Sequence, residues 1–124
     1  MEIPSDPRSR ALRLAAATEE ARALNLSILE VGERLALCEY FVLCHCRSPL
    51  HGEAIVERVE ERMSEWGSHP RHREGAKQGE WIVLDYGDVV LHVFSERARE
   101  FYSLERLWSE VPRLAPEPTS PPGG

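Results

Sequence analysis

The sequence lacks long hydrophobic runs. None of its apolar stretches approaches the ~20 residues that a helix needs to cross a bilayer, and the opening stretch MEIPSDPRSR lacks the hydrophobic segment of a signal peptide. Internal repeats are also absent. We therefore expect a cytoplasmic protein with no membrane partner. The length of 124 residues and the 42% hydrophobic content predict one soluble domain with a single core.

Cysteine is scarce as well, since the chain has three, at positions 38, 44 and 46. An odd number in a chain expected to be cytoplasmic favours reduced thiols over a disulfide framework. The C-x-C spacing of Cys44 and Cys46, with His45 between them, is a weak zinc signal because zinc sites usually use C-x₂₋₄-C pairs. We interpret the cysteines, Cys38 included, as small buried hydrophobes. We expect neither a metal nor a cofactor.

Positive charge is in short supply. The chain has 15 Lys and Arg residues against 21 Asp and Glu residues, which gives a formal net charge of −6 at pH 7. Proteins that bind nucleic acid through its phosphates need Lys and Arg to replace counterions. The composition therefore argues against nucleic acid as the primary partner, and a basic protein surface is the better electrostatic match.

Capping residues and hydrophobic patterns divide the chain into helices and strands. Asp6-Pro7 and Ser48-Pro49 each place an N-cap before a proline at the first helical position, and β-branched and aromatic runs indicate strands. The expected elements are a helix from Pro7 to about Leu24, strands over 26–31 and 40–46, a helix from Pro49 through Trp66, an edge strand within 68–79, a hairpin over 81–94, and short helices capped by Ser95 and Ser103.

This order predicts a small α/β domain in which helices flank a mixed sheet. We expect a lead-in over residues 1–10 and the domain over 11–111. Residues 112–124 are rich in Pro and Gly and have little apolar surface to bury, so they are predicted to form a disordered tail.

The hairpin is the most informative segment, WIVLDYGDVVLHVF. Gly87-Asp88 suits a two-residue turn, and pairing outward from that turn sets Tyr86 against Val89 and Trp81 against Phe94. Because side chains alternate along a strand, one face is almost wholly aliphatic and is expected to join the core. Its members are Ile82, Leu84, Tyr86, Val89, Leu91 and Val93.

The opposite face of the hairpin, called the second face below, mixes aromatic, aliphatic and ionisable side chains. It consists of Trp81, Val83, Asp85, Val90, His92 and Phe94. His92 is within diagonal reach of Asp85 in this register. Two interpretations stay open: a sheet face half covered by a helix or tail, or a binding surface, which large exposed apolar patches usually mark.

An enzymatic function has weak support. The pair Asp85 and Asp88 could hold a metal ion in a small nucleotide-handling enzyme, but no Gly-rich phosphate loop precedes it. Asp88 is also a common type of turn residue. We keep a metal-dependent enzyme that uses these two carboxylates as the alternative hypothesis.

The chain carries an ordered set of motifs. They are Glu39-Tyr40-Phe41-Val42, Ala54-Ile55, Glu74-Gly75, Trp81, Asp85-Tyr86-Gly87-Asp88-Val89-Val90, His92, Phe94 and Arg99-x-Phe101-Tyr102-x-Leu104-Glu105-x-Leu107-Trp108. Together these motifs resemble the ribosomal silencing factor family, also called Iojap-like proteins. The resemblance runs from about Leu12 to Glu110 and is most specific in the C-terminal half.

The resemblance implies a non-enzymatic translational repressor. Members of the family bind the large ribosomal subunit through ribosomal protein L-fourteen and prevent joining of the small subunit when nutrients run short. The implied fold is α/β and similar in outline to nucleotidyltransferases, without their catalytic residues. An acidic protein with an aromatic and acidic sheet face fits a basic ribosomal partner.

The resemblance also suggests which residues contact the ribosome: Glu74, Trp81, Asp85, Asp88, His92, Arg99 and Tyr102. The strand alternation places Trp81, Asp85 and His92 on the second face, whereas the others rest on the resemblance alone. The chain departs from the family at Pro49-Leu50-His51-Gly52, so the resemblance leaves open whether this segment contacts the partner. An aromatic face without its partner would also allow a homodimer of the free protein.

Overall fold

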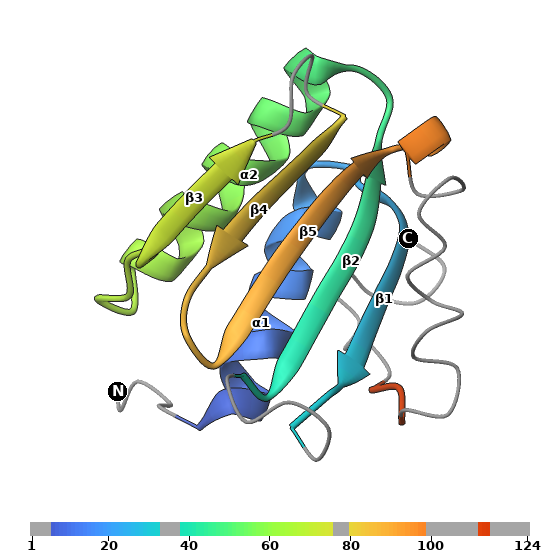
Figure 1. Cartoon of the computed structure of the whole chain (residues 1–124). Helices are drawn as coiled ribbons and strands as arrows, with labels where there is room; N and C mark the ends of the chain where they lie inside the picture. Colours follow the sequence, from blue (N-terminus) through green and yellow to red (C-terminus); the bar gives the residue numbers. More distant parts are fainter. Residues whose placement is uncertain (1–5, 33–37, 76–79, 99–111, 115–124) are drawn as a thin grey trace, which may run out of the picture.

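The structure is a computed structural model that describes residues 6–32, 38–75, 80–98 and 112–114. Within these residues the chain forms α1 (Pro7–Glu20), β1 (Leu24–Glu30), β2 (Tyr40–Cys46), α2 (Pro49–Ser64), β3 (His72–Gly75), β4 (Trp81–Asp85) and β5 (Val89–Ser95). The strands form one sheet in the order β1-β2-β5-β4-β3, with both helices on the same face (Figure 1). Strands β2 and β5 are parallel and the other pairs are antiparallel, so the predicted small α/β domain with a mixed sheet is confirmed.

Helix α1 begins as predicted but ends earlier than predicted. The Asp6 carboxylate accepts a hydrogen bond from the Ser9 backbone N–H at 2.9 Å, and Pro7 occupies the first helical turn. The helix ends at Glu20, not near Leu24, because Arg22 takes the left-handed conformation with φ of 63°. A left-handed residue stops the helical hydrogen-bond ladder, so β1 starts two residues before the predicted strand.

Helix α2 is capped as predicted, with the Ser48 hydroxyl accepting from the His51 N–H at 3.0 Å. The segment Pro49–Gly52 is its first turn. A Cβ at Gly52 would lie 3.2 Å from the Cys46 Sγ and 3.3 Å from the Ile82 Cδ1. A larger residue would therefore require the Cys46 and Ile82 side chains to shift by a few tenths of an ångström.

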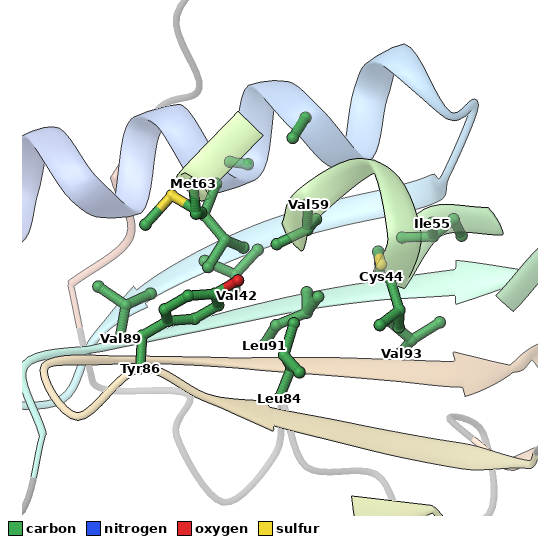
Figure 2. Packing of buried hydrophobic residues seen from close by; sticks show 14 of the residues in the cluster. Val42, Cys44, Ile55, Val59, Met63, Leu84, Tyr86, Val89, Leu91 and Val93 are labelled. Atoms are coloured by element: carbon green, nitrogen blue, oxygen red, sulfur yellow. The ribbon is translucent and has the colours of Figure 1, made fainter. Parts of the chain in front are cut away.

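The main core lies between the sheet and the two helices (Figure 2). All six residues of the predicted aliphatic hairpin face are buried there, and the observed pairs Trp81↔Phe94 and Asp85↔Val90 confirm the predicted register. The Tyr86 N–H donates to the Val89 carbonyl at 2.9 Å to close the turn, where Gly87 has a φ of 90°. The helices contribute the buried hydrophobic residues Ala11, Leu14, Ala15, Ala17, Ile55, Val56, Val59 and Met63 to this core.

The first residues of the predicted tail pair with the sheet. The Glu30 N–H donates to the Pro112 carbonyl and the Leu114 N–H donates to the Ile28 carbonyl, each at 2.9 Å. Residues 112–114 therefore extend the ordered chain along β1, which corrects the start of the predicted tail. They pair because the edge of β1 leaves backbone donors and acceptors that need partners. The rest of the tail, 115–124, lies outside the described residues.

The predicted edge strand is β3, and all four of its residues are exposed. The Ser95 hydroxyl accepts from the Ala98 N–H at 3.0 Å, as its predicted capping role requires, whereas Ser103 lies outside the described residues. None of the helices in the part of the chain that the structure describes is both long and apolar enough to span a bilayer.

The two faces of β4 should respond differently to truncation. Leu84 is fully buried among the helix-facing residues, so Leu84→Ala should lower the free energy of unfolding by about 2–5 kcal/mol. Val83 is half-buried on the second face, so Val83→Ala should cost markedly less. Urea unfolding of both variants measures the difference, and a larger loss for Val83→Ala would contradict the register.

Candidate functional site

The second face lies on the side of the sheet away from both helices. Val83 is in the middle of it, paired with His92 of β5 on one side and with Glu74 of β3 on the other. On the far side of β5, Phe41 pairs with Val90. The sheet order therefore extends the second face with residues that the hairpin sequence alone does not reveal.

One end of the second face is covered. Phe94 is fully buried and His92 is 8% exposed, whereas Trp81, Val83, Asp85 and Val90 are half-buried. Phe94 belongs to a second buried cluster with Leu29, Val31, Cys38, Leu43 and Ala98. The interpretation as a half-covered face thus holds for Phe94, which packs in this cluster, and for His92, which is also buried. The other four residues leave a partly exposed surface.

A hydrogen bond joins Trp81 and His92 on the second face. The Trp81 indole Nε1–H donates to the His92 Nδ1 at 3.2 Å, and the Trp81 ring lies 5.1 Å from that of Phe94. The register placed Asp85 within diagonal reach of His92, but the group that bonds to the His92 Nδ1 is the Trp81 indole and not the Asp85 carboxylate. Burial lowers the pKa of His92 to about 4. At neutral pH the imidazole is therefore neutral, with its proton on Nε2.

Asp85 shapes the turn from the second face. Its Oδ1 accepts from the Gly87 N–H at 2.7 Å, an arrangement in which an aspartate side chain stabilises a turn. Asp85 also borders a hollow of about 420 Å³, called the turn hollow below. Its lining comprises Cys38, Phe41, Arg71, Asp85, Gly87, Val90 and His92.

A second hollow, of about 310 Å³, lies beside it along the sheet. Its lining comprises Glu74, Gly75, Trp81 and Val83. Glu74 is exposed, and its carboxylate accepts from the His72 Nε2 at 2.7 Å. The predicted contact residues Glu74, Trp81, Asp85 and His92 therefore line two hollows on the same face of the sheet.

Asp88 has a different position. Its two carboxylate oxygens accept from the Arg10 Nε at 3.1 and 2.9 Å, so the side chain is held toward α1. Its backbone carbonyl accepts from the N–H groups of Glu39 and Tyr40 at 2.8 and 3.1 Å. Asp88 thus joins the hairpin turn to α1 and to the start of β2. Its role as a contact residue stays a prediction from the resemblance.

The other candidates can be placed only in part. Arg99 and Tyr102 lie outside the described residues. Sequence reasoning missed Phe41 and Arg71, which line the turn hollow. The sequence gives no sign that the Arg71 backbone N–H donates to the Asp85 carbonyl, which it does at 2.7 Å.

The cysteines are buried in two different clusters. Cys44 and Cys46 lie in the helix-facing core and Cys38 in the second cluster. Burial, with a smaller contribution from the nearby Asp85, raises the pKa of the Cys38 thiol to about 11. Within the described ranges, no group of three or more His, Cys, Asp or Glu side chains is placed to hold a metal ion.

The ion pair between Arg10 and Asp88 should raise the free energy of unfolding. It is partly buried, with side chains 16% and 25% exposed, so we expect a coupling free energy of about 1 kcal/mol in a double-mutant cycle of Arg10→Gln and Asp88→Asn. Unfolding in urea gives the four free energies. Additive losses would show that the pair contributes nothing.

The buried imidazole predicts a stability loss in acid. Because the pKa of His92 is about 4 in the folded protein and about 6.5 in the unfolded chain, the unfolded state binds the proton first as the pH falls below 6.5. The contribution of His92 to the free energy of unfolding should be fully present above that pH. It should fall by about 2 kcal/mol between pH 7 and pH 5. Unfolding curves for wild type and His92→Gln at both pH values should show a smaller acid loss in the variant.

The exposed His69 provides the matched control for that measurement. His69→Gln removes an exposed imidazole and keeps the buried one of His92. The loss of unfolding free energy between pH 7 and pH 5 should therefore be as large in this variant as in the wild type. An imidazole of His92 that titrates near 6.5 in an NMR titration would contradict the prediction.

The comparisons with known proteins agree on one family. A family model described as "Ribosomal silencing factor during starvation" matches residues 4–122. The ribosomal silencing factor RsfS of Bacillus subtilis is 34% identical over 98 residues, covering 79% of this chain and 83% of that protein. The chloroplastic protein Iojap of Zea mays is 28% identical over 106 residues, covering 83% of this chain and 45% of that protein.

Solved structures share the fold. A crystal structure of a protein from Chromobacterium violaceum matches with a TM-score of 0.78 and 25% identity, covering 100% of this chain and 95% of that one. One from Bacillus halodurans matches with a TM-score of 0.73 and 30% identity, covering 86% of this chain and 98% of that one. With the sequence motifs, the sheet order and these matches in agreement, the chain belongs to the ribosomal silencing factor family.

Proposed function

We propose that this protein silences ribosomes by binding the large subunit through ribosomal protein L-fourteen, which blocks joining of the small subunit. The observation that carries the proposal is the partly exposed second face, which combines aromatic and carboxylate side chains in an acidic chain. Family membership supports the silencing role, because the matching family is described by that role.

The chemistry of the second face supports a basic protein partner. Trp81 and Val83 offer apolar area next to the exposed carboxylate of Glu74. Interfaces typically draw most of their affinity from a few aromatic anchors, while charges at the rim steer association and set the orientation. The net charge of −6 adds a long-range attraction to a basic surface. In the free protein, the same face could pair with a second copy.

The alternative, a metal-dependent enzyme, has less support. Asp85 lies on the second face, whereas the Asp88 carboxylate is bonded to Arg10 of α1, which packs on the opposite face. Two carboxylates turned to opposite sides of a sheet are poorly placed to share one ion, and the guanidinium already neutralises one of them. We therefore favour a protein that acts by binding and not by catalysis.

The order of addition tests the proposed function. If the protein covers the joining surface of the large subunit, adding it before the subunits are mixed should reduce the joined-ribosome peak in a sucrose gradient. Adding it to joined ribosomes should do much less, because the small subunit then covers its site. Equal inhibition in both orders, or co-sedimentation with the small subunit alone, would overturn the proposal.

A charge reversal tests the surface. Glu74→Lys places a positive charge at the exposed rim of the second face and should weaken binding to the large subunit by about tenfold, since like charges in an interface cost free energy. Glu57→Lys is the matched control, because Glu57 is exposed on α2, on the other side of the sheet. Equal effects of the two variants in co-sedimentation would mean that only net charge matters and that the second face is not the docking surface.

A further inference from the structure

The turn hollow contains polar groups whose bonding capacity is not used within the protein. Its walls are apolar at Phe41 and Val90, and it opens beside the turn at Gly87. Three polar side chains border it, namely Arg71, Asp85 and His92. Each has a hydrogen-bonding group left over, and together these groups define what the hollow can hold.

His92 supplies a donor. Its Nδ1 accepts from the Trp81 indole, and Trp81 is not part of the lining of the hollow. A neutral imidazole has one N–H, so Nε2 carries the proton. This nitrogen is buried and has no hydrogen-bond partner among the described residues. A buried donor without an acceptor is unfavourable, so an acceptor that reached Nε2 from the hollow, which His92 lines, would stabilise it.

Asp85 supplies an acceptor and Arg71 a cation. The Asp85 Oδ1 is bonded to the Gly87 N–H, which leaves Oδ2 available. The Arg71 guanidinium lies over the same glycine, with Nη1 3.0 Å from the position that a Cβ on Gly87 would take. In the part of the chain that the structure describes, Arg71 and Asp85 do not form an ion pair with each other.

Among the described residues that line the turn hollow, the charged groups are one guanidinium and one carboxylate, which offset each other, while the imidazole and the thiol are neutral. A cation entering the hollow would meet Arg71, an anion would meet Asp85, and either would lose hydration against the apolar walls. An uncharged group that both donates and accepts can satisfy Asp85 and His92 without either penalty.

We propose that the turn hollow receives an uncharged polar side chain of the docked ribosomal protein, one ending in a carboxamide or a hydroxyl. Its N–H or O–H donates to the Asp85 Oδ2, and its oxygen accepts from the His92 Nε2–H. The proposal rests on the proposed function and adds a specificity pocket to it. Rim charges such as Glu74 give attraction, whereas the turn hollow selects one neutral residue on the partner.

The dependence of binding on salt separates the contribution of the turn hollow from that of the rim charges. Asp85→Asn keeps an oxygen for the Gly87 N–H but replaces the free acceptor with a donor. Affinity for purified large subunits should fall by about tenfold, the effect of losing a hydrogen bond to a charged group. The loss should be the same at low and high salt, because a short, buried contact is little screened.

Glu74→Gln is the matched control, since it also removes one negative charge from the second face. Its loss of affinity should shrink as salt rises, as expected for a solvated charge. Arg71→Gln should not strengthen binding if the occupant is neutral. Circular dichroism and urea unfolding of each variant confirm that the fold is retained.

If the wild-type protein binds large subunits, any of three results would contradict the proposal that the turn hollow receives a neutral side chain. These are a loss for Asp85→Asn that disappears at high salt, a loss no larger than that of Glu74→Gln, and tighter binding by Arg71→Gln, which would indicate a basic occupant. Failure of the wild-type protein to bind large subunits would instead overturn the proposed function, and the pocket with it.

Discussion

Strand β5 is paired on both edges and contributes buried side chains to a cluster on each face of the sheet. Its parallel partner β2 and its antiparallel partner β4 fix its hydrogen bonds, and its side chains enter two separate clusters, Leu91 and Val93 toward the helices and Phe94 on the other side. A strand held in this way cannot shift by one residue without exchanging the contents of both clusters. The position of every residue on the second face depends on that constraint.

The local parts of the fold could be predicted from the sequence. Asp6-Pro7, Ser48-Pro49 and Gly87-Asp88 encode caps and a turn within a few residues, and alternation gives the faces of the hairpin. The end of α1 could not be predicted in the same way, because nothing local distinguishes Arg22 as the residue that takes a positive φ. The pairing of residues 112–114 with β1 joins segments that are distant in the sequence, and no periodicity signals it.

The candidate site shows the same division. Alternation put Trp81, Asp85 and His92 on one face, but it could not show that the indole, not the carboxylate, would bond to the imidazole. The side chain of Asp88 is turned to the other side by Arg10, a residue 78 positions earlier. Arg71 reaches the turn hollow only because β3 lies beside β4. Contacts of this kind depend on strand order, which emerges when the sheet assembles.

Hydrogen bonds hold the turn between β4 and β5 on both sides of the sheet. Asp85 provides one on the second face, and Arg10 bonds to Asp88 on the helical side. This has a consequence for genetic screens. Substitutions of Arg10 that loosen the turn would alter the shape of a surface that Arg10 never touches. A screen for loss of silencing would then recover substitutions of Arg10 and suggest a ribosome contact on α1. Such a hit would report the geometry of the turn, and a suppressor at the turn itself would be its expected genetic signature.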